Sequence, residues 1–207
     1  MEIIMSDLTE KILNKASSLM SLYGISSVTM DDIAKECHIS KRTLYEQIPD
    51  KRTLVWKCVL FLKEQTAIEA KTLIYESSDT LDSLLHIYQH MRKHISDISS
   101  VFFKDIHRLY PDIEKQYNEM YLLQSKAFAN FLIKGVNEGV FRNDINFSLA
   151  SKAFLAQSSF IVKEFATKSD PQEILRMIDI AFIIFLRGIA TQKGLETIDI
   201  FLNDNII

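Results

Sequence analysis

The feature that most constrains this 207-residue chain is a helical spacing of hydrophobic residues that recurs along its length. Apolar side chains return at intervals of three and four residues, and residues that cap helices bound most of these segments. The chain has only 5 Gly and 3 Pro, fewer than a β-rich fold of this size usually needs for its turns. We therefore expect an all-α fold of about nine helices.

Capping signals place the predicted helices. Thr29 and Asp170 each begin a capping box, and Ser40, Asp50 and Asn146 are further N-caps. The expected helices cover residues 7–23, two short segments after positions 29 and 40, a segment from 50 into the seventies, 81–98, 101–109, 111 to about 138, 147–166 and 171 to about 192.

Composition bounds the class of protein. The net charge of −3 argues against a protein that coats nucleic acid generally. Cys37 and Cys58 fall in apolar helical patterns, which predicts buried free thiols and a reducing compartment. No signal peptide is evident over residues 1–6, and the most apolar run, 178–189, is too short to span a bilayer. We expect a cytoplasmic protein with no membrane partner.

Residues 29–54 carry the most specific chemistry, because they predict a helix-turn-helix. The second short helix carries Lys41, Arg42, Thr43 and Tyr45 on the side away from Leu44, which faces inward. In this motif the second helix enters the major groove of DNA while the first braces it. Seven residues are predicted to bind duplex DNA: Thr29, Ser40, Lys41, Arg42, Thr43, Tyr45 and Lys51.

Each predicted contact has a physical reason. The Arg42 guanidinium has the geometry to bridge O6 and N7 of guanine. Tyr45 and Lys41 suit phosphates, and Thr29 and Lys51 lie at helix N-termini, which attract anions. Residues 41–57 hold five basic and two acidic residues, a local net charge of +3 on a chain of net charge −3. This balance favours local docking on DNA, with two copies of the motif needed for tight binding.

This stretch resembles the DNA-binding domain of TetR-family transcriptional regulators over about residues 8–60. The matching pattern is Thr29, Ile33-Ala34, Ile39-Ser40, Thr43-Leu44-Tyr45 and Pro49-Asp50-Lys51-Arg52-Thr53-Leu54. Three positions depart from the family pattern: His38 replaces the frequent turn Gly, Ile48 replaces Phe, and Glu46 adds a negative charge to the reading face. We expect these departures to affect operator preference more than the fold.

The resemblance implies a DNA-binding domain at residues 1–55 and a helical effector-binding and dimerisation domain at 56–207. It implies a homodimer that binds a palindromic operator, acts as a repressor and is released by a small-molecule effector. No cofactor is expected. The alternative is a helical protein–protein interaction module that does not bind DNA. An enzyme ranks third, because no catalytic triad signature or Gly-rich phosphate loop is present.

The helix after Pro171 is apolar nearly all round and must be covered on every side. The preceding helix is rich in small residues, which permit close approach of a neighbour. The predicted dimer residues are Phe154, Ile178, Ala181, Phe182, Phe185 and Ile189. A two-fold dimer would set two reading helices about 34–36 Å apart. The alternative is a buried central helix in a monomer.

Aromatic residues concentrate in the middle of the chain and permit an apolar ligand site. The predicted pocket residues are Tyr88, Phe102, Phe103, His107, Tyr121, Phe128 and Phe154. Each of these residues, taken singly, is more typical of an ordinary hydrophobic core than of a pocket. Together they favour a site for an apolar or aromatic effector.

Three histidines, His86, His90 and His94, follow Asp82 at intervals of four residues. An HxxxH spacing can chelate zinc. Each step of four rotates the position by about 40°, however, so three such side chains diverge. They are interpreted as a solvated polar face, and no metal site is predicted.

Overall fold

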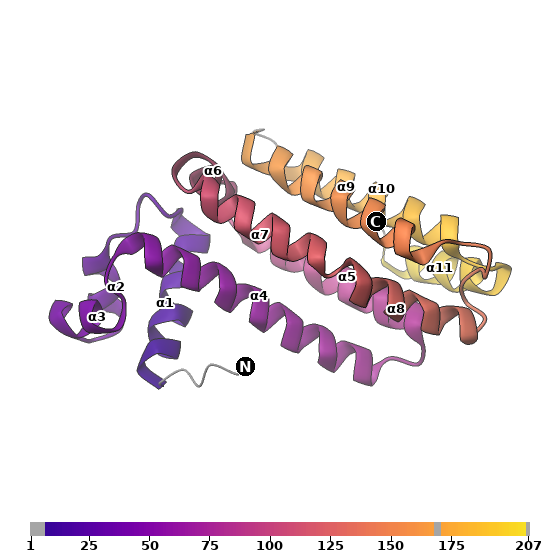
Figure 1. Ribbon diagram of the computed structural model, residues 1–207, viewed down its shortest axis with the longest axis horizontal. Helices are drawn as coiled ribbons and strands as arrows, with labels where there is room; N and C mark the ends of the chain where they lie inside the picture. The colour runs from indigo at the N-terminus through magenta and orange to yellow at the C-terminus, as the bar shows by residue number, and fades with distance from the viewer. Residues whose placement is uncertain (1–6, 168–170, 206–207) are drawn as a thin grey trace.

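The computed structural model describes residues 7–167 and 171–205, and the described chain is helical, as expected. Its helices, in chain order, are α1 (Asp7–Tyr23), α2 (Met30–Glu36), α3 (Lys41–Gln47), α4 (Lys51–Glu76), α5 (Thr80–Asp97), α6 (Ser100–Leu109), α7 (Pro111–Leu123), α8 (Ser125–Asn137), α9 (Phe147–Thr167), α10 (Pro171–Ile189) and α11 (Gln192–Asn205). Figure 1 shows α1–α3 and the start of α4 at one end of an elongated molecule. No described helix is long and apolar enough to cross a membrane.

The N-terminal helices begin where their capping residues predict. Thr29 and Asp32 form the full capping box of α2, Ser40 accepts from the Thr43 backbone N–H at α3, and Asp50 caps α4. Each cap satisfies a backbone donor that would otherwise lack a partner. Further on, the Asn146 side chain accepts a hydrogen bond from the Leu149 backbone N–H at the start of α9. The capping box predicted at Asp170 lies outside the described residues.

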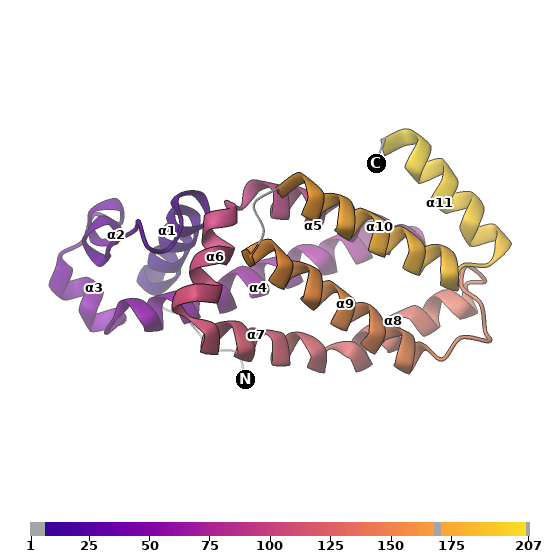
Figure 2. The ribbon, with the colours of Figure 1, turned by 90° about the horizontal axis from the view of Figure 1, so that it is seen from above.

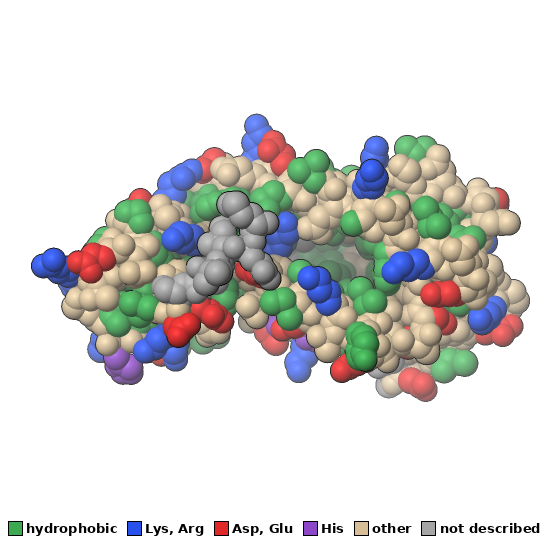
Figure 3. All heavy atoms as spheres, turned by 60° about the horizontal axis from the view of Figure 1, so that its bottom comes forward, with side chains coloured by type: hydrophobic (Ala, Val, Ile, Leu, Met, Phe, Trp, Pro, Cys, Tyr) green, Lys and Arg blue, Asp and Glu red, His purple; other side chains and the backbone are tan. Residues whose placement is uncertain are grey.

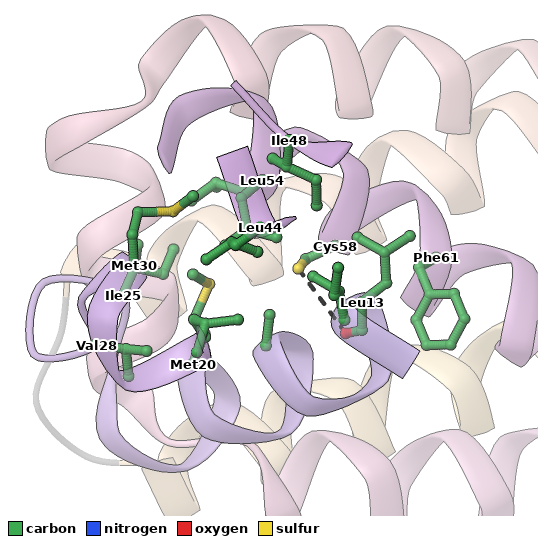
Figure 4. Close-up of a cluster of buried hydrophobic side chains, with 14 of the residues drawn as sticks. Leu13, Met20, Ile25, Val28, Met30, Leu44, Ile48, Leu54, Cys58 and Phe61 are labelled. Carbon is green, nitrogen blue, oxygen red and sulfur yellow. Dashed lines mark hydrogen bonds between the residues drawn. The ribbon is translucent and has the colours of Figure 1, made fainter. Parts of the chain in front are cut away.

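One apolar cluster holds α1–α3 together with the first half of α4 (Figure 4). Leu13, Leu44 and Leu54 come from three different helices and are essentially inaccessible to water. Cys37 and Cys58 are buried free thiols, as predicted. Cys58 approaches the Leu13 carbonyl oxygen at 4.0 Å, and burial raises the pKa of its thiol to about 12. The cluster also includes Phe102 of α6 and Ile113 of α7, so the predicted boundary at residues 55/56 falls inside a shared core.

A second apolar cluster fills the C-terminal region and draws on α5, α8, α9, α10 and α11. The central helix is α9, which packs against α6, α7, α8 and α10. Figure 2, seen from above, shows α9 and α10 side by side on one face, with α11 angled away at the far end.

The buried carboxylate of Asp179 ties α10 to α5. Arg92 binds it in a bidentate manner, through Nε at 2.8 Å and Nη2 at 3.2 Å, and the Tyr88 hydroxyl donates to Oδ1. The Tyr88 ring also stacks on Phe182, with ring centroids 4.0 Å apart. Burial and the neighbouring carboxylate raise the pKa of Tyr88. Asp179 interrupts the apolar pattern of α10, and its buried charge is compensated by these partners on α5.

Two details of the C-terminal region differ from the sequence expectation. The helix expected from 111 to about 138 is divided at Gln124, whose backbone N–H bonds to Tyr121 O at 3.1 Å in a tighter turn. The last helix was expected to continue to about 192, but α10 ends at Ile189, and Ala190 bridges Phe141. At this point the segment after α8 contacts the end of α10, where the Arg142 backbone N–H bonds to Ile189 O at 2.8 Å. The chain then continues into α11, which the sequence analysis did not predict.

Candidate DNA-binding surface

The turn between α2 and α3 has the geometry of a helix-turn-helix. His38 adopts φ 55°, the left-handed conformation that the family pattern usually gives to Gly. His tolerates this region with some strain. The Ile39 backbone N–H bonds to Ala34 O at 3.0 Å and closes the turn. Leu44 on the inner side of α3 is fully buried. The opposite side of the helix therefore faces solvent.

The predicted contact residues of α3 lie on that outer side. Lys41, Arg42 and Tyr45 are exposed, while Thr43 is half-buried and its hydroxyl lies 2.8 Å from that of Ser40. Figure 1 shows α3 at the tip of the molecule, clear of the C-terminal helices. The N-terminal half of α3 can therefore approach a major groove without interference from the rest of the chain.

Both cations of α3 are already engaged by carboxylates. Lys41 Nζ lies 2.5 Å from Asp31 of α2, and this partner raises the pKa of Lys41. Arg42 Nε bonds to Glu46 Oε1 at 2.9 Å, one turn along the same helix. These pairs are solvent-exposed and therefore weak. Phosphates or base edges can replace them, but Glu46 competes with any DNA contact made by Arg42.

The N-termini of α2 and α4 are capped by Thr29 and Asp50. Lys51, the first residue of α4, is only half-exposed, and burial lowers its pKa while Asp105 and Asp32 oppose that shift. It is the least exposed of the three predicted cationic contacts, because Lys41 and Arg42 lie on the open face of α3.

Asp105 of α6 is a residue that the sequence analysis missed. Its side chain is buried, and Oδ2 accepts a hydrogen bond of 2.6 Å from the Ser26 backbone N–H in the α1–α2 turn. The Ser99 backbone N–H also bonds to Ser21 O at 2.8 Å. Asp105 and Ser26 are 79 residues apart, so no local pattern could have paired them. Through these contacts α6 holds the helix-turn-helix against the C-terminal region.

The seven predicted pocket residues lie in three places: on α6, in the second apolar cluster and on α7. Phe102, Phe103 and His107 belong to α6, where Phe102 joins the N-terminal cluster. Phe103 packs against that cluster and against a third, small cluster of Ile161, Ile174 and Ala181. Tyr88, Phe128 and Phe154 belong to the second cluster. Tyr121 of α7 stacks on Tyr117 with ring centroids 6.5 Å apart. His107 Nδ1 lies 2.9 Å from Glu114.

One surface hollow lies beside the α8–α9 loop, and another lies near the middle of the molecule. A surface recess of about 400 Å³ lies beside the α8–α9 loop and is lined by Ile133, Val136, Asn143, Ile145, Asn146, Phe147 and Ser148. It contains none of the seven predicted pocket residues. Figure 3 shows another hollow near the middle of the molecule, bordered by hydrophobic side chains and by Lys or Arg side chains.

The predicted dimer residues differ in exposure within one chain. Ala181, Phe182 and Ile189 are buried, and Phe154, Ile178 and Phe185 are half-buried. The apolar residues of α9 and α10 that face solvent are different ones: Leu149, Ala153, Ala156, Phe160, Ile180 and Ile184. They follow helical spacing on the two adjacent helices, a pattern that the sequence analysis did not separate from the core side.

Comparison with known proteins gives this surface its context. Residues 12–56 match the family model of bacterial regulatory proteins, tetR family. None of the curated proteins matches the chain. The family match covers α2, the turn, α3 and the beginning of α4, which are the elements that carry the predicted DNA contacts.

Solved structures match nearly the whole chain in fold. A TetR-family transcriptional regulator from Agrobacterium tumefaciens is 17% identical, with a TM-score of 0.64 over 89% of this chain and 98% of that one. A transcriptional regulator from Saccharomonospora viridis in complex with choline is 18% identical, with a TM-score of 0.67 over 91% and 100%. The repressor FadR of Thermus thermophilus in complex with lauroyl-CoA is 18% identical, with a TM-score of 0.58 over 89% and 96%. Residues 12–56 are thus similar to the DNA-binding part of the tetR family of bacterial regulatory proteins, and the described chain has the fold of the solved TetR-family regulators.

Proposed function

We propose that the protein is a homodimeric transcriptional repressor that binds a palindromic operator and is released by a small apolar or aromatic effector. The observation that carries the proposal is the outer side of α3, where Lys41, Arg42, Thr43 and Tyr45 stand opposite the buried Leu44 within a family-matched helix-turn-helix. Thr29, Ser40 and Lys51 complete the proposed contact set. Residues 1–55 would bind DNA and residues 56–207 would sense the effector and dimerise.

The solvent-facing apolar residues of α9 and α10 support the dimer. Ile180 and Ile184 are 58% and 66% exposed, and Phe160 is 58% exposed on the neighbouring helix. Ala153 and Ala156 are also exposed on α9, and their small side chains leave room for a partner helix. Two copies of this face would form a four-helix interface, in line with the expected C2 symmetry of homodimers.

The contacts of α6 support effector control. This helix carries Phe103, which lies between the two regions, and Asp105, which holds the α1–α2 turn. Arg52 of α4 also pairs with Asp112 of α7. An effector that favours one position of α6 and α7 would therefore favour one placement of the helix-turn-helix.

The half-buried tyrosine pair supports an apolar site. Tyr117 and Tyr121 remain partly accessible, yet burial raises the pKa of both phenols, that of Tyr121 to about 12. Contact with these two rings would favour ligands with hydrocarbon or aromatic groups over charged ones. Lauroyl-CoA, which a protein of similar fold binds, is a suitable probe because it carries an apolar lauroyl chain on a charged coenzyme A group, and choline is a cationic comparison.

The proposal is tested by selecting genomic fragments that bind the full chain. We expect enriched sites with two inverted half-sites about one helical turn apart. Enrichment of unrelated sequences without two-fold symmetry would contradict the palindromic operator.

Dimerisation is tested by sedimentation of Ile184→Arg, with Ile200→Arg as a matched control. Ile200 is 64% exposed but lies on α11. We expect Ile184→Arg to be monomeric and to lose operator affinity, and Ile200→Arg to remain dimeric. A dimeric Ile184→Arg would place the interface elsewhere.

A thermal-shift and gel-shift series tests the effector. Lauroyl-CoA should raise Tm and weaken operator binding, whereas choline should do neither. The absence of both effects across apolar and aromatic compounds would contradict effector control.

A further inference from the structure

The structure assigns a second candidate site to the α4–α5 contact: we propose that Glu69, His90 and His94 bind a zinc ion. One ligand atom from each of these residues lies within 4.8 Å of the other two. Glu69 belongs to the second half of α4, and the two histidines lie one turn apart on α5. The α4 and α5 helices pack along each other.

The distances are close to those that zinc requires. Glu69 Oε2 lies 3.8 Å from His90 Nδ1 and 3.5 Å from His94 Nε2. Ligand atoms about 2.0–2.2 Å from a tetrahedral zinc ion stand roughly 3.3–3.5 Å from one another. Small rotations of the imidazoles would therefore bring the three atoms to one ion. The two rings already meet edge to face, with centroids 4.5 Å apart.

Glu69 provides independent support. Its Oε2 is buried and has no hydrogen-bond partner among the described residues. A buried carboxylate oxygen that lacks a donor costs free energy, and a bound cation would offset that cost. The same oxygen is the atom that faces both histidines.

The sequence pattern alone argues against zinc, because three histidines at intervals of four residues diverge around the helix. That argument holds for His86, which instead lies near Asp82 and Ser77, at 3.5 and 3.4 Å. It does not hold for the remaining pair, because a third ligand comes from another helix. With two imidazoles and one carboxylate the site suits zinc and leaves one coordination position for water. Magnesium prefers oxygen ligands in octahedral geometry and fits poorly.

Zinc binding is measured on the full chain, freed of metal with a chelator, by competition with a chromophoric zinc indicator. We expect one zinc ion per chain and a rise of Tm with zinc but not with magnesium. His94→Ala and Glu69→Gln should each weaken binding by about tenfold or more. His86→Ala, a matched control on the same helix, should bind zinc like the wild type.

The inference is overturned if the wild type takes up no zinc at micromolar concentration, or if His94→Ala binds as well as the wild type. Equal loss in His86→Ala would also overturn it, because the site would then be a different one. Circular dichroism checks that each surface variant remains folded. Because no DNA enters the assay, its result is independent of the proposed operator binding.

A bound ion would also fix the second half of α4 against α5. Since α4 begins beside the helix-turn-helix at Lys51, the ion would act on the element that joins the two regions. This consequence rests on the proposed function, whereas the site itself does not.

Discussion

The two ends of the molecule achieve stability in different ways. In the N-terminal region short helices are fixed by caps three residues away, such as Thr29 with Asp32 and Ser40 with Thr43. In the C-terminal region the decisive contacts join distant segments, such as Tyr88 with Asp179 and Thr80 N–H with Glu138 Oε2 at 2.8 Å. Local chemistry therefore specifies the helices of the proposed DNA-binding surface, while the C-terminal region depends on tertiary pairing.

The largest expected effect breaks the C-terminal pairing. Asp179→Ala removes the acceptor of Arg92 and Tyr88 and leaves the Tyr88 hydroxyl buried without it. We expect a loss of about 4 kcal/mol in the free energy of unfolding, because one partner of a buried ion pair is removed. Urea denaturation measures it. Asp199→Ala, which removes the exposed partner of Arg187, should cost no more than about 1 kcal/mol.

The next effect tests the contact between the two regions. Gly24 has φ +84°, and an added Cβ would lie 2.5 Å from Val101 Cγ1 of α6. Gly139 has φ +76°, but a Cβ there would meet nothing within 4 Å. Gly24→Ala should cost about 3 kcal/mol through backbone strain and overpacking, and Gly139→Ala about 1–2 kcal/mol through strain alone. Equal losses in thermal or urea unfolding would show that the α6 contact contributes little.

A smaller effect concerns the DNA-binding surface itself. Glu46→Gln removes the charge that engages Arg42 and that would repel phosphates. We expect affinity for non-specific duplex DNA to rise by a factor of about 2–5, with a modest change in operator affinity. Fluorescence anisotropy at constant salt measures both. Glu119→Gln, which removes a carboxylate 4.0 Å from Lys115 on α7, is the control and should change neither.

The smallest effect is a pH dependence at the cap of α4. The Thr53 backbone N–H lowers the pKa of Asp50, so this carboxylate stabilises the fold above about pH 4 and loses that contribution as pH falls through its lowered pKa. Asp50→Asn keeps a good N-cap and has no charge to titrate. Its unfolding free energy should match the wild type at neutral pH and fall less steeply in acid. Parallel acid titrations would mean that the cap contributes nothing measurable.

The same difference between the two regions explains which features the sequence could predict. The caps at Thr29, Ser40 and Asp50, the inward face of Leu44 and the buried thiols all follow from spacing within a few residues. The Asp105–Ser26 contact and the proximity of Glu69 to two histidines depend on segments that meet only after folding. Five of the seven predicted DNA contacts are exposed and the other two, Thr43 and Lys51, are half-buried, whereas the predicted pocket residues are divided among separate clusters.

The most direct test of the central claim, that α3 and the start of α4 bind duplex DNA, is operator affinity as a function of salt. The variants are Tyr45→Ala, Lys51→Ala and, as a control remote from α3, Lys193→Ala on α11. We predict that wild-type affinity falls steeply with salt, that both N-terminal variants bind more weakly, and that Lys51→Ala reduces the slope of log K against log salt by about 1 per contact. Lys193→Ala should match the wild type. Affinity and slope that are unchanged in both Tyr45→Ala and Lys51→Ala would contradict the account.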